Sequence, residues 1–486
     1  MHLGPVHLVA HQLFKPFLIV GFAFWLAALL RGMMPQGRPG ANQGAAWHWA
    51  LVLVIAAYVC ASIYSAGVNY IDSDWAATGA TVILHGFTGV VRTFTAVSPD
   101  GFYRPTLLLS LWFDRAVFGS ALPAYHAQSI LLHSLNALLA YRFGRELGIE
   151  AKAAFWGSAV FLMAAADFEP IMWPAARTDL FATAFILLTL IWFWKGELWL
   201  AAGAYVLGLL SKESVYCVPL LLAAVAIHKR MARPQMIRAG VIFGAITLAM
   251  LAVRIAIYGN LGGYPPTIAG GQSPHFTFGL KTITSILTRV IPMPLLGLNL
   301  SVEISRRMAA FVALYLVAIV WAVIGGARLE RAERLLIVMA LASAVPMMNL
   351  IGWVGESMKH SRYLYLPGLW MIMAAAAVMA RVRFGNVALA LLAVANVAGS
   401  AHNIGVYRSV VGEAHTMARQ VVHDAAERHA SAVDLSGVDP EPYGVVLFRR
   451  EIADLVRAER PEMCIEFEVR SCGTAVPVLK YQWPQR

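Results

Sequence analysis

Charged residues are scarce in this chain. Only 13% of its 486 residues are Asp, Glu, Lys or Arg, whereas 59% are hydrophobic and the mean hydropathy is +0.65. Soluble domains average about 25% charged residues, so this composition excludes an ordinary soluble protein and indicates an integral membrane protein. The apolar runs are long enough for helices that cross a hydrocarbon core of about 30 Å. Because these runs are continuous rather than alternating, the strands of a membrane barrel are excluded.

A concentrated basic block is also missing. The formal net charge is +11, but Lys and Arg are dispersed in short loops, without a block that contains interleaved aromatic residues. This distribution is typical of charges that orient helices in a membrane, and it does not favour nucleic-acid binding. The first apolar run, 14–30, lacks a small-residue cleavage site, so we expect no cleaved signal there. That run begins with Lys15-Pro16, so it either spans the membrane or lies at its interface.

The apolar runs predict an all-α polytopic membrane protein with about twelve transmembrane helices. The predicted spans are 14–30, 48–67, 125–143, 153–167, 178–194, 197–210, 214–228, 237–257, 308–326, 334–351, 363–380 and 384–402. One set of loops is short and basic, which places it in the cytoplasm. The other loops are longer and rich in Pro, Gly and aromatic residues, which places them outside: 68–124, 168–177, 211–213, 258–307 and 352–362.

Residues 403–486 differ in composition from the predicted transmembrane domain, 1–402. They hold many of the acids, a predicted helix around 409–430 and the strand-like runs "YGVVLF" and "VPVLKY". We therefore expect a small water-exposed α/β domain, and the topology places it on the outer, periplasmic side.

Cysteine is rare, with four residues in the chain. Cys464 and Cys472 lie in the polar C-terminal segment and could pair in an oxidising compartment such as a periplasm. Cys60 and Cys217 lie inside apolar runs, where we expect small core residues.

Ionisable residues collect at the predicted outer ends of the spans, where they are candidates for function because they are costly to bury in a membrane. The large first outer loop, 68–124, carries Asp72 and Asp74 in "NYIDSDW" and Arg104 in "FYRPTLLLSLWFD". Shorter outer loops add more: Glu169, Arg177 and Asp179 in "DFEPIMWPAARTD", Lys212 and Glu213 in "SKES", and Glu356, Lys359, His360, Arg362, Tyr363 and Tyr365 in "GESMKHSRYLY".

This mixture of acids and cations suits a reaction in which a hydroxyl loses its proton while an anionic group leaves. A carboxylate can accept the proton, and Arg or Lys can hold a phosphate. Alternatively, the closely spaced Asp72 and Asp74 could bind a divalent metal, Mg or Mn, that neutralises the phosphate.

A polar stripe marks the predicted span 125–143. His126, Ser129, His133 and Asn136 follow one another at steps of three, four and three, so they share one helical face. Such a stripe either faces a wet cavity or ties helices together by hydrogen bonds. His126 is nearest the outer end and is therefore the best candidate for a site.

Five further observations point to a family. The segments "IDSDW", "FYRPTLLLSLWFDRAVFG" with "YHAQSILLHSLNALLAY", "EPIMWPAARTDLFATAFILL", "LLSKESVYCVPLLL" and "KHSRYLYLPGLW" occur in this order, over roughly residues 65–370. Together they resemble the GT-C superfamily of integral-membrane glycosyltransferases. They are most similar to the branch of protein O-mannosyltransferases and membrane mannosyltransferases with tetratricopeptide repeats, although the repeats are absent here. Residues 403–486 match no part of that pattern.

The resemblance implies a polyprenyl-phosphate-linked sugar as donor, and transfer to an acceptor hydroxyl on the outer side with inversion at the anomeric carbon. It implies that Asp72 and Asp74 are catalytic, with Asp74 slightly preferred as the base. We expect the donor phosphate to contact Arg104, Lys212 and Arg362. Glu169 and Arg177 should either lie near the acceptor or support the residues that contact the substrates. His126 and Tyr363 complete the predicted site.

The expected setting is the inner membrane of a bacterium, because the chain is rich in Ala and Arg and its tail is short. The site would face the periplasm, and the acceptor would be a glycan, a lipid or a protein.

Other functions remain open from sequence. A transporter or flippase of lipid-linked glycans would also have about twelve spans, but its polar residues usually lie at mid-membrane and between repeats, and no repeat is found here. An O-antigen ligase-like transferase is harder to distinguish from such a glycosyltransferase by sequence. "IDSDW" could also be a helix cap, and Lys212 and Glu213 could merely solubilise a turn.

Overall fold

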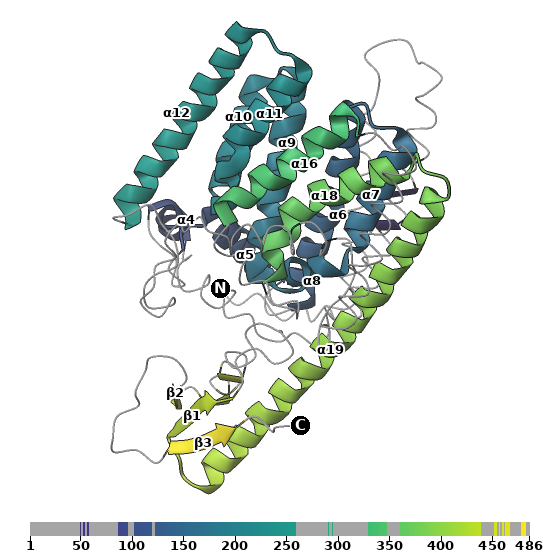
Figure 1. The fold of residues 1–486 in the computed structure, drawn as a ribbon. Coiled ribbons are helices and arrows are strands. Elements are labelled where there is room, and N and C mark those ends of the chain that lie inside the picture. Colours follow the sequence, from purple (N-terminus) through teal and green to yellow (C-terminus); the bar gives the residue numbers. More distant parts are fainter. Residues whose placement is uncertain are drawn as a thin grey trace, which may run out of the picture.

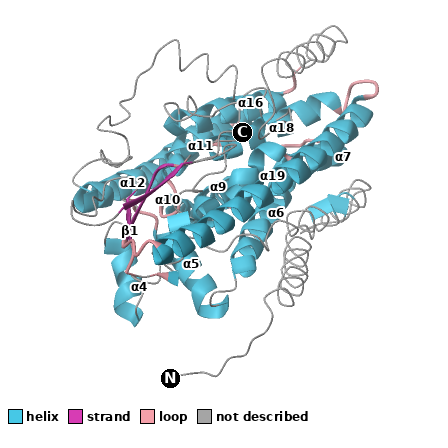
Figure 2. Cartoon of the chain, turned by 90° about the horizontal axis from the view of Figure 1, so that it is seen from below, coloured by secondary structure: helices cyan, strands magenta, loops and turns pink. Residues whose placement is uncertain are grey.

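The computed structural model describes residues 86–95, 102–118, 122–258, 329–347, 360–438, 462–466 and 478–482, and a few single positions elsewhere. These residues are mostly helical, as predicted (Figure 2). Four helical segments are long and apolar enough to cross a membrane: Pro174–Lys195, Arg233–Ile257, Ser361–Met379 and Gly385–Glu427. This part of the chain therefore fits the predicted class of helical membrane protein. The predicted spans 14–30 and 308–326 lie outside the described residues.

Four helices form the centre of the bundle. They are α6 (Leu122–Glu146), α7 (Ala151–Met163), α9 (Arg177–Lys195) and α18 (Tyr365–Met379). Helices α7 and α18 approach closely at Gly157, where a Cβ atom would lie 2.6 Å from Met373 Sδ. A larger residue at 157 would thus have to displace the Met373 side chain.

Part of the predicted polar stripe on α6 ties this centre together. His133 Nε2 lies 3.0 Å from the carbonyl of Leu162, so it must carry the proton, and Nδ1 then accepts the hydroxyl of Tyr365 at 2.8 Å. Asn136 donates to the same hydroxyl at 3.1 Å. His133 and Asn136 therefore join α6 to α7 and α18, which is the interhelical role considered for them.

A second group of helices packs beside this centre (Figure 1). It contains α10 (Leu198–Leu209), α11 (Val218–Lys229), α12 (Arg233–Tyr258) and α16 (Arg331–Ala344). Helices α10 and α12 expose large apolar side chains, among them Trp199, Val241 and Leu248. An apolar surface of this kind suits contact with lipid. The short helices α4 (Gly86–Thr95) and α5 (Pro105–Phe118) lie near the C-terminal ends of α10 and α12, which point downward in Figure 1.

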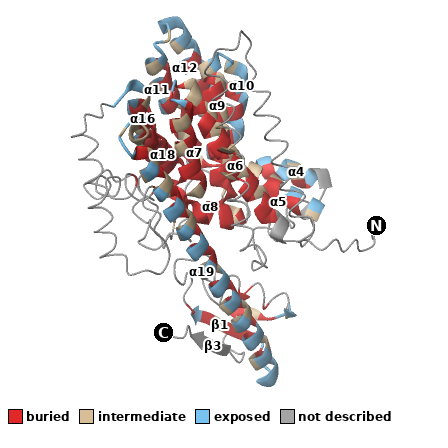
Figure 3. Cartoon of the chain, turned by 90° about the vertical axis from the view of Figure 1, so that its right-hand side faces the viewer, coloured by how far each residue is buried: buried red, intermediate tan, exposed pale blue. Residues whose placement is uncertain are grey.

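The longest helix is α19 (Gly385–Glu427), with 43 residues and a length of about 65 Å. The sequence predicted a span over 384–402 and a separate helix around 409–430, so the observed continuity corrects that division. No proline interrupts residues 385–427, and buried Ile404, Val410 and Ala414 continue its packed face across the predicted gap. The first half of α19 packs on the bundle, whereas its C-terminal end extends away from the bundle (Figure 3).

A small parallel sheet packs against the far end of α19. Its strands are β1 (Ala432–Gly437), β2 (Cys464–Glu466) and β3 (Val478–Gln482), in the order β2-β1-β3. Val433, Leu435 and Ile465 share an apolar core with residues of α19. The predicted run "VPVLKY" overlaps β3, whereas "YGVVLF" lies outside the described residues. Cys464 is disulfide-bonded and Cys217 is a buried free thiol.

Candidate functional site

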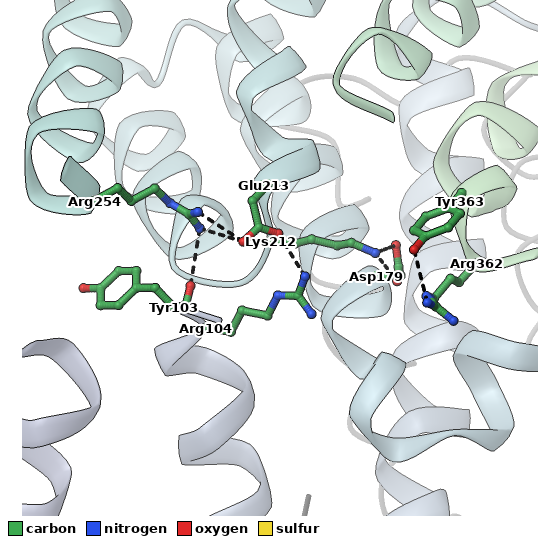
Figure 4. Close-up of polar contacts among 8 residues, drawn as sticks. All are labelled: Tyr103, Arg104, Asp179, Lys212, Glu213, Arg254, Arg362 and Tyr363. Atoms are coloured by element: carbon green, nitrogen blue, oxygen red, sulfur yellow. Dashed lines mark hydrogen bonds and ion pairs between the residues drawn. The ribbon is translucent and has the colours of Figure 1, made fainter. Parts of the chain in front are cut away.

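Charged side chains from six separate segments meet at one end of the bundle, and Figure 4 shows all of them except Glu169. We call them the charged row: Arg254, Glu213, Arg104, Lys212, Asp179, Arg362 and Glu169. Arg104 precedes α5, Asp179 lies in the first turn of α9, and Arg254 lies near the end of α12. The others come from short turns, namely Lys212 with η4 (Glu213–Cys217), Glu169 in α8 (Phe168–Met172) and Arg362 in η7 (Ser361–Leu364).

Glu213 forms one end of the row, between two arginines. Its carboxylate accepts hydrogen bonds from Arg104 Nη2 at 3.0 Å and from both terminal nitrogens of Arg254 at 3.1 Å. Burial alone would raise the pKa of Glu213, but the two guanidinium groups outweigh it and lower the pKa to about 2. Arg254 Nη2 also donates to the carbonyl of Tyr103 at 3.3 Å. Glu213 therefore stays ionised and holds α5, η4 and α12 together.

Lys212 and Asp179 form the middle of the row. Lys212 Nζ lies 2.5 Å from the Asp179 carboxylate, and the two side chains are only 4% and 7% exposed. Burial lowers the pKa of Lys212, and the charges of Arg104 and Arg362 act in the same direction against the attraction of Asp179. The Lys212 ammonium also lies 5.6 Å from the centre of the Tyr363 ring. Lys212 thus connects the two ends of the row.

Arg362 and Glu169 form the other end. Both the side chain and the backbone N–H of Arg362 donate to the Glu169 carboxylate, the latter at 3.2 Å. The Arg362 guanidinium lies 4.9 Å from the ring centre of Trp173 and 4.8 Å from that of Tyr363. Burial raises the pKa of Glu169, and the charge of Arg362 opposes that rise. The turn that presents Arg362 depends on His360, whose backbone is left-handed with φ of 63°.

The row contains four cations, Arg104, Lys212, Arg254 and Arg362, and three carboxylates, Asp179, Glu169 and Glu213. One positive charge is thus in excess. Arginine forks bind phosphate oxygens in the same geometry as carboxylate oxygens. Chemically, the row can accept an anion, with the internal carboxylates as its competitors.

The predicted site residues fall into three groups. Five of them, Arg104, Lys212, Arg362, Tyr363 and Glu169, are brought together by the row. Arg254 was missed by the sequence reasoning, although a charged residue within the predicted span 237–257 is itself a signal of function. Asp72 and Asp74, predicted as catalytic or metal-binding, lie outside the described residues.

The third group, Arg177 and His126, lies in a different cluster. The buried Arg177 guanidinium donates to Asp114 at 2.6 Å and to the Tyr125 carbonyl at 2.6 Å. Its other acceptors are Ser110, Gln128 and Ser129. His126 is buried close to this guanidinium, and no described contact joins it to the charged row. Burial raises the pKa of Asp114 to about 6, against the influence of Arg177.

A metal site is not found within the described ranges, where no three His, Cys, Asp or Glu side chains come together in a suitable group. Comparison of the chain with protein-family models, with curated proteins and with solved structures gave no match.

Proposed function

We propose that this protein is an inverting glycosyltransferase of the GT-C type, which transfers a sugar from a polyprenyl-phosphate donor to an acceptor hydroxyl. The observation that carries the proposal is the convergence of Arg104, Lys212 and Arg362 from three distant segments. These are the residues that were expected from the sequence to hold the donor phosphate. An anionic leaving group needs positive charge fixed in advance of the reaction, and the charged row offers it.

In the proposed reaction, the acceptor hydroxyl attacks the anomeric carbon of the sugar. The bond between that carbon and the phosphate oxygen breaks, and polyprenyl phosphate leaves with the electron pair. The hydroxyl proton passes to a carboxylate, which we assign to Asp74 or Asp72. Arg104, Lys212, Arg362 and the newly found Arg254 stabilise the negative charge on the departing phosphate. A divalent metal on Asp72 and Asp74 is an optional addition to this scheme.

The topology belongs to the same proposal. The chain would span a bacterial inner membrane about twelve times, with the charged row and residues 403–486 in the periplasm. In support, the turns that carry the row, at 102–104, 168–177, 211–213 and 360–362, all fall in or beside loops that the Lys and Arg distribution places outside. Helices α10 and α12, with their exposed apolar side chains, offer a route by which a lipid-linked donor reaches the row from the bilayer.

The test is a transfer assay with the purified full-length protein and defined polyprenyl-phosphate sugars. The wild type, Asp72→Asn and Asp74→Asn are compared with and without a metal chelator. We expect transfer by the wild type and a loss of at least roughly a hundredfold in one of the two variants. Normal rates in both variants would remove the catalytic assignment, and no reaction with any donor would remove the proposed function.

A further inference from the structure

Three buried polar atoms without described hydrogen-bond partners belong to residues beside one end of the charged row. Within the described residues, Asp167 Oδ2, Ser361 Oγ and Trp173 Nε1 have no partner. Asp167 is only 4% exposed and Ser361 only 2%. Unpaired buried groups are costly in folded proteins, so three of them on residues beside one ion pair call for an explanation.

These three atoms come from residues that flank the same ion pair. Asp167 ends η2 (Ala165–Asp167), which packs against η7, and it precedes Glu169 by two residues. Ser361 directly precedes Arg362, and Trp173 stacks on the guanidinium of Arg362. The Asp167 carboxyl accepts hydrogen bonds and, when protonated, also donates one. The Trp173 indole is a donor, and the Ser361 hydroxyl can be either. A ligand hydroxyl, which donates one hydrogen bond and accepts others, matches this set.

The turn that carries Asp167 is held by a stripe on α19, made of Asn396, Ser400, Asn403 and Tyr407. Asn396 accepts the backbone N–H of Ala165 at 3.0 Å, and Asn403 donates to the carbonyl of the same residue at 3.3 Å. Ser400 donates to the Met163 carbonyl at 3.3 Å. The Tyr407 ring packs edge-on against Phe168.

Steps of four, three and four place this stripe on one face of α19. The N–H and C=O of Ala165 and the C=O of Met163 thus have partners on a helix that lies more than 200 residues away in the sequence. The α19 stripe therefore fixes the backbone of the turn that carries the unpartnered Asp167 Oδ2.

We propose that Asp167 binds a hydroxyl group of a neutral, sugar-like ligand, and that the α19 stripe positions it for this purpose. This inference rests on the proposed function, in which the hydroxyl belongs to the glycan acceptor or the donor sugar. Asp167 Oδ2 accepts the hydrogen bond of that hydroxyl, while Trp173 and Ser361 supply the remaining contacts. Water offers the same hydrogen-bonding chemistry, so the experiment must distinguish a sugar hydroxyl from water.

The experiment measures binding without any donor. Full-length protein in lipid nanodiscs is studied by saturation-transfer NMR with a panel of methyl glycosides: methyl α-mannoside, methyl β-glucoside and methyl β-galactoside. We expect at least one glycoside to receive saturation from the wild type. Asp167→Leu should bind it roughly tenfold more weakly. Asn396→Leu should weaken binding as well, and Asn403→Leu repeats that test if the first variant does not fold.

Two controls separate binding from structure. Asn386→Leu makes the same exchange elsewhere on α19. Asn386 Oδ1 has no described hydrogen-bond partner, so this variant should bind glycosides like the wild type. Asp167→Leu should unfold at an equal or higher temperature than the wild type, because it removes a buried carboxylate oxygen that lacks a partner.

The proposal is overturned by any of three results. No glycoside signal from the wild type would mean that Asp167 meets only water. Equal glycoside binding by Asp167→Leu would remove its role, and a lower unfolding temperature for that variant would show a structural role instead. Since no donor is present, a failed transfer assay leaves these measurements unaffected, so failure of the proposed function and of this inference are distinguishable.

Discussion

Two buried arginine clusters in this protein use the same residue type in different ways. Arg177 and its partner Asp114 are both 0% exposed, and the guanidinium has five acceptor residues. In the charged row, Arg104 and Glu213 remain 16% and 29% exposed, and Arg362 is shared between a carboxylate and two aromatic rings. The Arg177 guanidinium is saturated by the protein itself. The charged row keeps part of its surface accessible, and for this reason it is the better candidate for an anion site.

The largest effect should follow from breaking the Arg177 cluster. Arg177→Met leaves Asp114 buried without its cation, so we expect a loss of about 3–5 kcal/mol in the free energy of unfolding. The matched control is Arg142→Met, which breaks the partly exposed pair with Glu146 on the same helix and should cost no more than about 0.5 kcal/mol. Thermal unfolding of the two purified variants compares them. Similar stability would mean that burial does not separate the clusters.

The second effect concerns activity. Lys212→Met removes a cation from the middle of the charged row, and we expect transfer from the polyprenyl-phosphate sugar to slow by roughly a hundredfold. Lys195→Met, at the exposed end of α9, should transfer at the wild-type rate. Measuring kcat and KM for the donor in both variants checks this. A normal rate in Lys212→Met would break the link between the row and catalysis.

The two clusters should also respond to pH with opposite signs. The pKa of Glu213 is lowered to about 2 in the folded protein from 4.5, so its stabilising contribution is present above pH 4.5 and is lost as the pH falls toward 2. The pKa of Asp114 is raised from 3.8 to about 6, so its contribution is present below 3.8 and is lost as the pH rises to 6.

Unfolding temperatures of the wild type, Glu213→Gln and Asp114→Asn across this range measure the difference. Glu213→Gln should lose less stability than the wild type below pH 4.5. Asp114→Asn should remove a decline in stability between pH 3.8 and 6. If the unfolding temperatures of all three proteins changed with pH in parallel, the opposite pKa shifts of Glu213 and Asp114 would be contradicted.

The smallest effect should come from Tyr363→Phe. This change removes the hydroxyl that accepts a hydrogen bond from Arg362 at 3.2 Å, but it keeps the ring that stacks on the guanidinium. We expect a few-fold increase in donor KM, equivalent to about 0.5–1.5 kcal/mol. Tyr363→Leu, which also removes the ring, should have a larger effect. The reverse order would show that the hydroxyl, rather than the stacking, orients Arg362.

The sequence predicted the segments of the site better than its contacts. Arg104, Lys212 and Arg362 stood out because each is a charge at the end of an apolar run, and the structure brings them together. Their partners could not be predicted, because pairing depends on how the helices pack. Arg254 was missed because the search was confined to the ends of the predicted spans. Nothing in the sequence distinguished Arg177, which the protein itself saturates, from Arg362 of the charged row.

The fold shows the same limit. Composition predicted a helical membrane protein, but the change in composition after residue 402 indicated the end of a span where α19 continues. Asn403 is in fact buried against the turn of Ala165. A polar residue that pairs with another segment's backbone cannot be told from a surface residue by composition alone.

The central claim, that the charged row holds the phosphate of the donor, is tested most directly by its leaving group. The measurement is competition by undecaprenyl phosphate, without a sugar, against binding of a fluorescent polyprenyl phosphate to the wild type, Arg104→Met and Lys195→Met in nanodiscs. The account predicts roughly tenfold weaker competition in Arg104→Met and unchanged competition in Lys195→Met. Equal competition in all three proteins would contradict it.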